Sequence, residues 1–393
     1  MSVSSRRITG AAVLLGLLGA GLATLALVDV SAAPSLARRG SSGAGPGGLP
    51  AAIRPAAAGI AGNAGIAGNA RNARNAASSR SGLRLLSEAA AAGVATSYQG
   101  VQIVAWLGPH GSSTSVVQVW HQHDRSILAQ VTDMGSAPAA TSAQTSAGEQ
   151  DPDGILGLSR QLLGLMCANY QVADAGWGSA DGRPAQLVDL RRPDGSLAAR
   201  FWLDAVTKLP LRREIFDARA RMISEDAFIS LQLGDSGLRG MPATDVRPWS
   251  ARLDPPQIAR LAAQGWPMPA KLPGNLILVA AHAATTRAGQ VIDLDYSDGL
   301  SVVSIFLQRG QLPGAIPGWR EIMLRGRAVY SADPGLRSIA WSAHGYVYTV
   351  IAEAPPATVD QVVSALPHDA GTGFWGRIAR GLRRLASLAN PFR

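Results

Sequence analysis

The pattern of hydrophobic and polar positions predicts a first folded unit over residues 81–234. Apolar residues recur at helical spacing between Leu83 and Ala90, and from Tyr98 the pattern changes to the alternation that is typical of strands. Asp153 can cap a second helix, whose apolar side begins with Ile155 and Leu158. Turn residues separate the further strands, which we expect over 115–123, 186–190, 198–203, 211–216 and 222–233.

A smaller second unit is predicted over residues 263–368, after a linker over 235–262 that is rich in Gly, Pro, Ser and Asp. Its last helix is expected to be capped by Thr358. Strands are expected over 275–282, 291–296, 300–307 and 327–330, and a hairpin is expected to join 339–341 to 346–350. Strands joined by short turns, with a few helices, predict an α+β protein with antiparallel sheets.

The first 33 residues have the organisation of an export signal. Arg6 and Arg7 precede an uncharged stretch of 21 residues, and the small residues of 30–33 follow it. About 20 apolar residues cross a bilayer, so residues 1–33 are either a cleaved signal peptide or a retained inner-membrane anchor. In both cases the arginines stay inside and the remaining chain is exported.

A low-complexity segment follows over residues 34–80. It consists mainly of Ala, Gly, Pro, Asn and Arg and includes two near-repeats over 59–70. With almost no large apolar side chains it cannot bury enough surface to offset the entropy of ordering it. The segment is therefore predicted to be a disordered tether.

The C-terminal segment, residues 369–393, is predicted to form a basic amphipathic helix. Its apolar side chains fall within one arc of a helical wheel and its arginines occupy the opposite arc. This segregation suits a helix that lies in a membrane interface, and packing on its own domain is the alternative. The residues assigned to the interface helix are Phe374, Trp375, Arg377, Ile378, Arg380, Leu382, Arg383 and Arg384.

The net charge of +9 is concentrated in the two flanks. Residues 1–82 carry +7 and residues 371–393 carry +5, which leaves −3 on the folded body. A nucleic-acid-binding domain carries its positive charge on the folded unit, so no nucleic-acid partner is expected. Cys167 is the single cysteine, which excludes intramolecular disulfides and clustered-thiolate metal sites.

Two short patterns could carry enzyme chemistry. Gly234-Asp235-Ser236-Gly237 matches the tetrapeptide around the nucleophile of trypsin-like proteases, but no general-base His and orienting Asp accompany it in context. His121 and His123 share one face of a predicted strand beside Asp124, and a four-coordinate metal site needs a further ligand. A turn and a pair of strand histidines are the favoured interpretations, so no catalytic residue, metal ligand or cofactor is assigned.

Several stretches resemble the MucB/RseB family, in the same order and with matching spacing, over residues 83–366. The most specific is Tyr296-Ser297-Asp298-Gly299-Leu300, which precedes a strand rich in Val and Ser. The other matching stretches, in chain order, are Tyr98-Gln99-Gly100, Asn169-Tyr170, Gly182-Arg183-Pro184, 199–204, 209–214, Leu272-Pro273-Gly274 and 348–356.

The resemblance implies that the first unit is a curved antiparallel half-barrel over helices, similar to the LolA/LolB lipoprotein carriers, with a lipid-sized apolar cavity. It implies a non-enzymatic regulator of the periplasm or cell envelope that binds the extracytoplasmic part of a membrane-spanning anti-sigma factor. Binding would shield that factor from proteolysis, and a lipid or amphiphile would release it. A carrier that uses the same cavity to transport lipid or lipoprotein is the alternative.

Strand parity suggests which side chains line the cavity, with ordinary core packing as the alternative for each. These are Tyr98, Val101, Ile103, Val117, Val119, Phe201 and Leu203. Asp298 and Gly299 are assigned first to a tight turn and second to contact with the protein partner.

Overall fold

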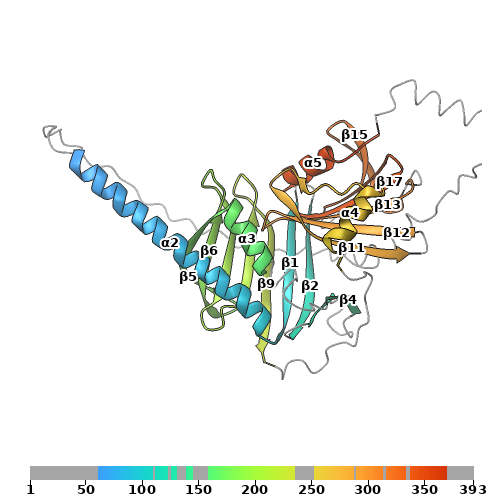
Figure 1. Cartoon of the computed structure of the whole chain (residues 1–393). Helices are drawn as coiled ribbons and strands as arrows, with labels where there is room; N and C mark the ends of the chain where they lie inside the picture. Colours follow the sequence, from blue (N-terminus) through green and yellow to red (C-terminus); the bar gives the residue numbers. More distant parts are fainter. Residues whose placement is uncertain are drawn as a thin grey trace, which may run out of the picture.

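The protein contains two antiparallel sheets, each with helices on one face (Figure 1). The computed structural model describes residues 61–108, 111–122, 125–130, 139–144, 158–234, 252–286, 289–312, 316–332 and 337–369. The predicted leader over 1–33, the start of the predicted tether and residues 370–393 of the predicted basic helix lie outside these residues. Within the described residues, no helix is both long enough and apolar enough to cross a membrane.

The first sheet has nine strands in the order β4-β3-β2-β1-β9-β8-β7-β6-β5. The strands are β1 (Tyr98–Gly108), β2 (Gly111–Gln122), β3 (Arg125–Gln130), β4 (Ala139–Gln144), β5 (Gln171–Ala180), β6 (Arg183–Arg191), β7 (Leu197–Asp204), β8 (Pro210–Phe216) and β9 (Met222–Leu233). β-Bulges interrupt several ladders, for example between Val101 and Gln102 and between Trp202 and Leu203. Because a bulge increases the local twist, these positions help the sheet to curve.

Two helices pack on the first sheet. They are α2 (Ala61–Ala95) and α3 (Arg160–Asn169), and their buried side chains, among them Leu85 and Leu162, form one core with Phe201 of the sheet. The tether predicted over 34–80 is therefore wrong for residues 61–80, which belong to α2. Alanine has the highest intrinsic helix propensity, and the packed C-terminal part of α2 supplies the nucleus that such a sequence needs.

The boundaries of α3 also differ from the prediction. Its N-cap is Ser159, whose side chain accepts a hydrogen bond of 3.2 Å from the backbone N–H of Leu162. Asp153, the predicted cap, lies outside the described residues. Leu158 and Leu162 are buried, so the predicted apolar side is confirmed although the helix begins later.

The second sheet has eight strands in the order β10-β11-β12-β13-β17-β16-β15-β14. The strands are β10 (Lys271–Leu272), β11 (Leu276–Thr286), β12 (Gly289–Ser297), β13 (Val302–Arg309), β14 (Arg320–Leu324), β15 (Arg327–Ala332), β16 (Arg337–Ala343) and β17 (Tyr346–Glu353). Helices α4 (Pro255–Ala263) and α5 (Pro356–Ala365) contribute Leu261 and Val359 to the core on one face of this sheet. The α+β fold with antiparallel sheets is confirmed.

Both helices of the second domain correct details of the prediction. All of helix α4 except Ala263 lies inside the predicted linker, and Asp254 begins the helix with a capping box whose partner is Gln257. Its N-terminal prolines suit the first helical turn, where no backbone N–H is needed. Helix α5 begins after Pro355 without a side-chain cap, so Thr358 lies within its first turn and is not the cap.

Candidate functional site

The two domains meet where the end of α3 contacts the turn between β12 and β13. The hydroxyl of Tyr170 donates a hydrogen bond of 2.6 Å to Oδ2 of Asp298, and the side-chain amide of Asn169 donates one of 2.8 Å to the Asp298 carbonyl. Burial and the negative charge of Asp298 raise the pKa of Tyr170 above its ordinary value of 10.0, so the hydroxyl keeps its proton. The tyrosine therefore acts as a donor to a buried carboxylate.

The turn itself is built to approach α3 closely. Oδ1 of Asp298 accepts the backbone N–H groups of Leu300 and Ser301, at 2.9 and 2.7 Å, which closes the predicted tight turn. Gly299 has a φ of +104°, and a Cβ there would lie 2.4 Å from the backbone nitrogen of Met166. Leu300 is buried in the core of the first domain. Only glycine fits this approach.

A buried ion-pair network forms a second contact between the domains. The Arg213 guanidinium lies 2.5 Å from Asp226 in the first domain and 3.2 Å from Glu353 in the second. Burial opposes the charge of Arg213, but the two carboxylates outweigh it and raise its pKa. A third contact runs from the side-chain amide of Gln161 to the Val279 carbonyl, at 3.1 Å.

A pocket of about 420 Å³ opens at this junction. Its wall combines Tyr170, Arg192 and Ala198 from the first domain with Asp298 and Thr358 from the second. The Arg192 guanidinium donates hydrogen bonds to backbone carbonyls at the start of β7 and the end of β8, namely those of Leu197, at 2.7 Å, and Phe216. The pocket is thus lined by polar and apolar residues of both domains.

The residues assigned to a lipid cavity do not all lie on one surface. Tyr98, Val117 and Val119 pack together, with Phe228, on the face of the sheet that bears the helices. Phe201 and Leu203 are fully buried in the neighbouring core against α2 and α3. Val101 and Ile103 lie on the opposite face, because successive side chains of β1 alternate. Those two residues cannot share a cavity with Tyr98, and their assignment is corrected.

The remaining sequence candidates are partly described. His121 is buried and its ring stacks on Tyr98, with 5.0 Å between the ring centres, so it has a structural environment. His123, Asp124, Ser236 and the arginines of the C-terminal segment lie outside the described residues. Asp298 and Gly299 are used within the chain, in the bond to Tyr170 and in the close approach to α3, and Asp298 also lines the pocket at the junction.

Sequence reasoning missed the role of Arg213 and Tyr170 in joining the domains. Arg213 had a local signal, because it shares the strand parity of Leu211 and Ile215, which are both buried. A charged side chain at an inward position needs a buried partner. Tyr170 lies 128 residues from Asp298, and no local pattern indicates which residues meet over such a distance.

The fold defines a class of two-domain α+β proteins in which antiparallel sheets carry helices on one face and meet through a polar junction. Residues 113–255 match the MucB/RseB N-terminal domain. No curated protein sequence matches the chain.

Three solved structures are similar to the chain. The crystal structure of MucB has a TM-score of 0.50 and 20% identity, and the match covers 74% of this chain and 99% of that one. The complex of MucB with MucA(peri) has a TM-score of 0.45 and 21% identity, covering 74% of this chain and 100% of that one. The Pseudomonas aeruginosa MucA/MucB complex has a TM-score of 0.46 and 20% identity, with the same coverage. At this identity the likeness concerns the fold.

Proposed function

We propose that this protein is a non-enzymatic, exported regulator that binds the extracytoplasmic part of a membrane-spanning anti-sigma factor. The observation that carries the proposal is the match of residues 113–255 to the MucB/RseB N-terminal domain. MucB, whose fold this chain shares, has been solved in complex with MucA(peri). The export signal and the acidic body of the sequence are consistent with a protein partner outside the cytoplasm.

Binding would protect the anti-sigma factor from proteolysis. A protease acts on accessible, locally extended backbone, and a segment held by a folded partner is withheld from it. The junction supports this role, because a pocket of about 420 Å³ there is lined by residues of both domains, among them Tyr170 and Thr358. A segment bound across the junction would contact both domains at once.

Release would follow the entry of a lipid or amphiphile into the apolar inner face of the first domain. The cluster of Tyr98, Val119, Leu209 and Phe228 is buried, and we assign this ligand to the space that would form if the cluster opened. A ligand that favours one domain arrangement lowers the affinity for a partner that prefers the other, and the effect is reciprocal. The N-terminal segment and the basic C-terminal helix would keep the protein near the inner membrane.

The first experiment isolates the full-length protein from its own membranes in mild detergent, after crosslinking, and identifies the proteins and lipids that co-elute by mass spectrometry. Recovery of a single-span anti-sigma factor is expected. Recovery of lipid or lipoprotein without an anti-sigma factor would replace the regulator with a carrier, the alternative that would use the same apolar cluster around Tyr98.

A second experiment tests protection directly. The purified protein is added to the extracytoplasmic segment of the recovered anti-sigma factor, and the rate at which a protease cleaves that segment is measured with and without the co-purified lipid. Slower cleavage that the lipid reverses is expected. Cleavage at the same rate with saturating protein would contradict the protective role.

A further inference from the structure

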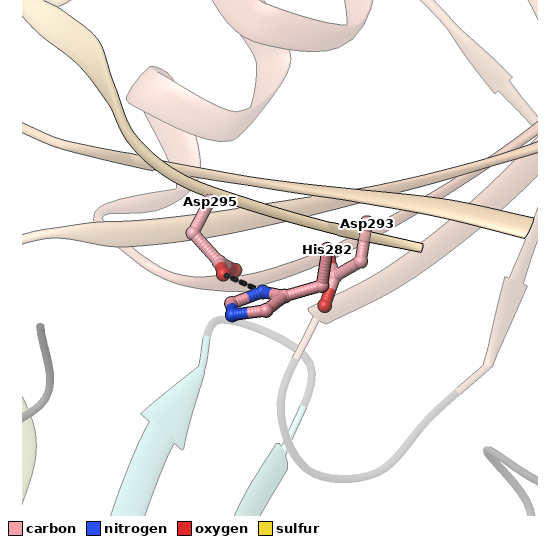
Figure 2. A group of neighbouring side chains, drawn as sticks. All are labelled: His282, Asp293 and Asp295. Carbon is pink, nitrogen blue, oxygen red and sulfur yellow. Dashed lines mark ion pairs between the residues drawn. The ribbon is translucent and has the colours of Figure 1, made fainter. Parts of the chain in front are cut away.

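Three potential metal ligands lie together on the second sheet, where no ligand was expected from the sequence. His282 on β11 is directly opposite Asp293 on β12, and Asp295 follows two positions later on the same face. Nδ1 of His282 lies 3.7 Å from Oδ2 of Asp295, and one ligand atom from each of the three residues lies within 4.8 Å of the others (Figure 2). Strand register therefore fixes one imidazole and two carboxylates side by side.

The cluster lies on the face of the sheet that is turned away from α4 and α5. The alternate residues Ile292 and Leu294 of β12 point into the core beneath those helices, so Asp293 and Asp295 point to the other side. The His282 and Asp295 side chains are 25% and 18% exposed, while Asp293 is 7% exposed. An ion can thus reach the cluster from solvent and still be largely enclosed.

We propose that His282, Asp293 and Asp295 bind a divalent transition-metal ion, with Zn²⁺ as the ion that suits them best. A neutral imidazole nitrogen with two carboxylate oxygens is a donor set for Zn²⁺ and not for Ca²⁺ or Mg²⁺, which prefer oxygen alone. The donors of a tetrahedral Zn²⁺ site lie about 3.4 Å apart, so rotations of the three side chains suffice to close the cluster around the ion. Water would complete the coordination.

A neighbouring hydroxyl supports the geometry. Ser304 on β13 is directly opposite Asp295 and its hydroxyl donates a hydrogen bond of 2.6 Å to Oδ1. That bond orients the carboxylate so that Oδ2 faces the imidazole of His282. Hydrogen bonds of this kind, made to metal ligands by their neighbours, typically contribute 10- to 100-fold to metal affinity.

The metal-ligand cluster lies on the face of the second sheet that contacts the first domain, so metal binding could respond to the arrangement of the two domains. Glu353, which contacts Arg213 of the first domain, lies on the same face of the sheet as Asp295, because β13 and β17 continue the register of β12. The metal-bearing face is thus the face that meets the first domain. Binding of Zn²⁺ itself does not depend on the anti-sigma role.

The test uses the full-length protein after treatment with a chelator. Zn²⁺ is titrated in by calorimetry, and Co²⁺ is substituted so that its visible absorption reports a nitrogen and oxygen coordination shell. One ion per chain is expected. His282→Ala should weaken binding at least tenfold and remove the Co²⁺ spectrum, and Ser304→Ala should weaken binding about tenfold.

His344→Ala is the matched control, because His344 also lies near a carboxylate in the same domain, 3.9 Å from Asp369, and no third ligand joins them among the residues that the structure describes. It should leave the affinity unchanged. Melting curves without metal establish that each variant is folded, and Ser304→Ala keeps the test decisive if His282→Ala does not fold. Absence of stoichiometric Zn²⁺ binding, or equal affinity in the wild type, His282→Ala and Ser304→Ala proteins, would overturn the proposal and leave an ordinary His–Asp ion pair.

Discussion

The hydroxyl of Tyr170 provides the most direct test of how the domains are held together. Tyr170→Phe removes one oxygen atom and keeps the ring, so the change is confined to the bond of 2.6 Å to Asp298. Asp298 is only 6% exposed, which leaves its carboxylate poorly solvated when the donor is lost. A hydrogen bond to a charged group contributes roughly 1.5–3 kcal/mol, which corresponds to about a 10- to 150-fold shift toward separated domains.

Amide hydrogen exchange measures this shift. The backbone N–H groups of Leu300 and Ser301 are buried in the junction, where they donate to Asp298, and they exchange when the domains separate. Their exchange should accelerate about 10- to 150-fold in Tyr170→Phe. Amides of the second-domain core, such as those of Ile339 and Trp341, should keep their rates.

The matched control is Tyr346→Phe, which removes a hydroxyl that donates a hydrogen bond of 2.8 Å to the Gly265 carbonyl within the second domain. This variant should leave exchange at Leu300 and Ser301 unchanged. Exchange within twofold of the wild type at those amides in a folded Tyr170→Phe protein would refute the reasoning, because the hydroxyl would then contribute nothing to domain association. An equal acceleration in both variants would show a general loss of stability instead.

Three further predictions concern stability and lipid binding. Burial lowers the pKa of His368 below 6.5, so its contribution to the free energy of unfolding is present above pH 6.5 and is lost as the pH falls. In urea titrations, the free energy of unfolding should therefore decrease less between pH 7 and 5 in His368→Phe than in the wild type. Burial raises the pKa of Asp204, but hydrogen bonds from Arg183 and the 206–207 backbone outweigh it and lower the pKa from 3.8 to about 2. Asp204→Asn should therefore lower the free energy of unfolding by about 2 kcal/mol at pH 7, measured by urea unfolding. The difference between the variant and the wild type should shrink as the pH falls through 2. Val117 is half-buried at the edge of the apolar cluster, so Val117→Trp should reduce the amount of lipid that co-purifies without unfolding the protein. An unchanged amount of lipid in a folded variant would contradict the assignment of the lipid to this cluster.

The sequence is informative where a segment has a strong period of its own. Strand β9 is observed at the predicted bounds, 222–233, because Ile, Phe and Leu residues recur along it and Gly234 follows it with a φ of +86°. Strand β5 was not predicted, since its Ala, Gly and Ser residues have low strand propensity and an edge position demands less of them. Helix α4 was hidden because Pro255 and Pro256 were interpreted as linker residues, although proline also favours the first turn of a helix.

The candidate site was predictable only as fragments. Asn169-Tyr170 and Asp298-Gly299 both stand out through the family resemblance, but no local pattern indicates that they meet. The three residues of the metal-ligand cluster are likewise brought together by the fold and not by a local sequence pattern. His282 and Asp293 become neighbours through the register of β11 and β12, which depends on a bulge between Leu278 and Ala280. A register one residue away would send His282 to the other face of the sheet.

Helix α2 has a mechanical consequence that follows from its length. Its attachment to the sheet begins near Ser78, which donates a hydrogen bond to the Asp174 carbonyl, and the preceding turns extend beyond the sheet (Figure 1). The span from Ala61 to Ala77 has a helical rise of about 25 Å. A rod of this length sets a direction as well as a distance, which a flexible coil cannot do. The rod would therefore fix the height and tilt at which the body faces any surface that holds the N-terminal side of the chain.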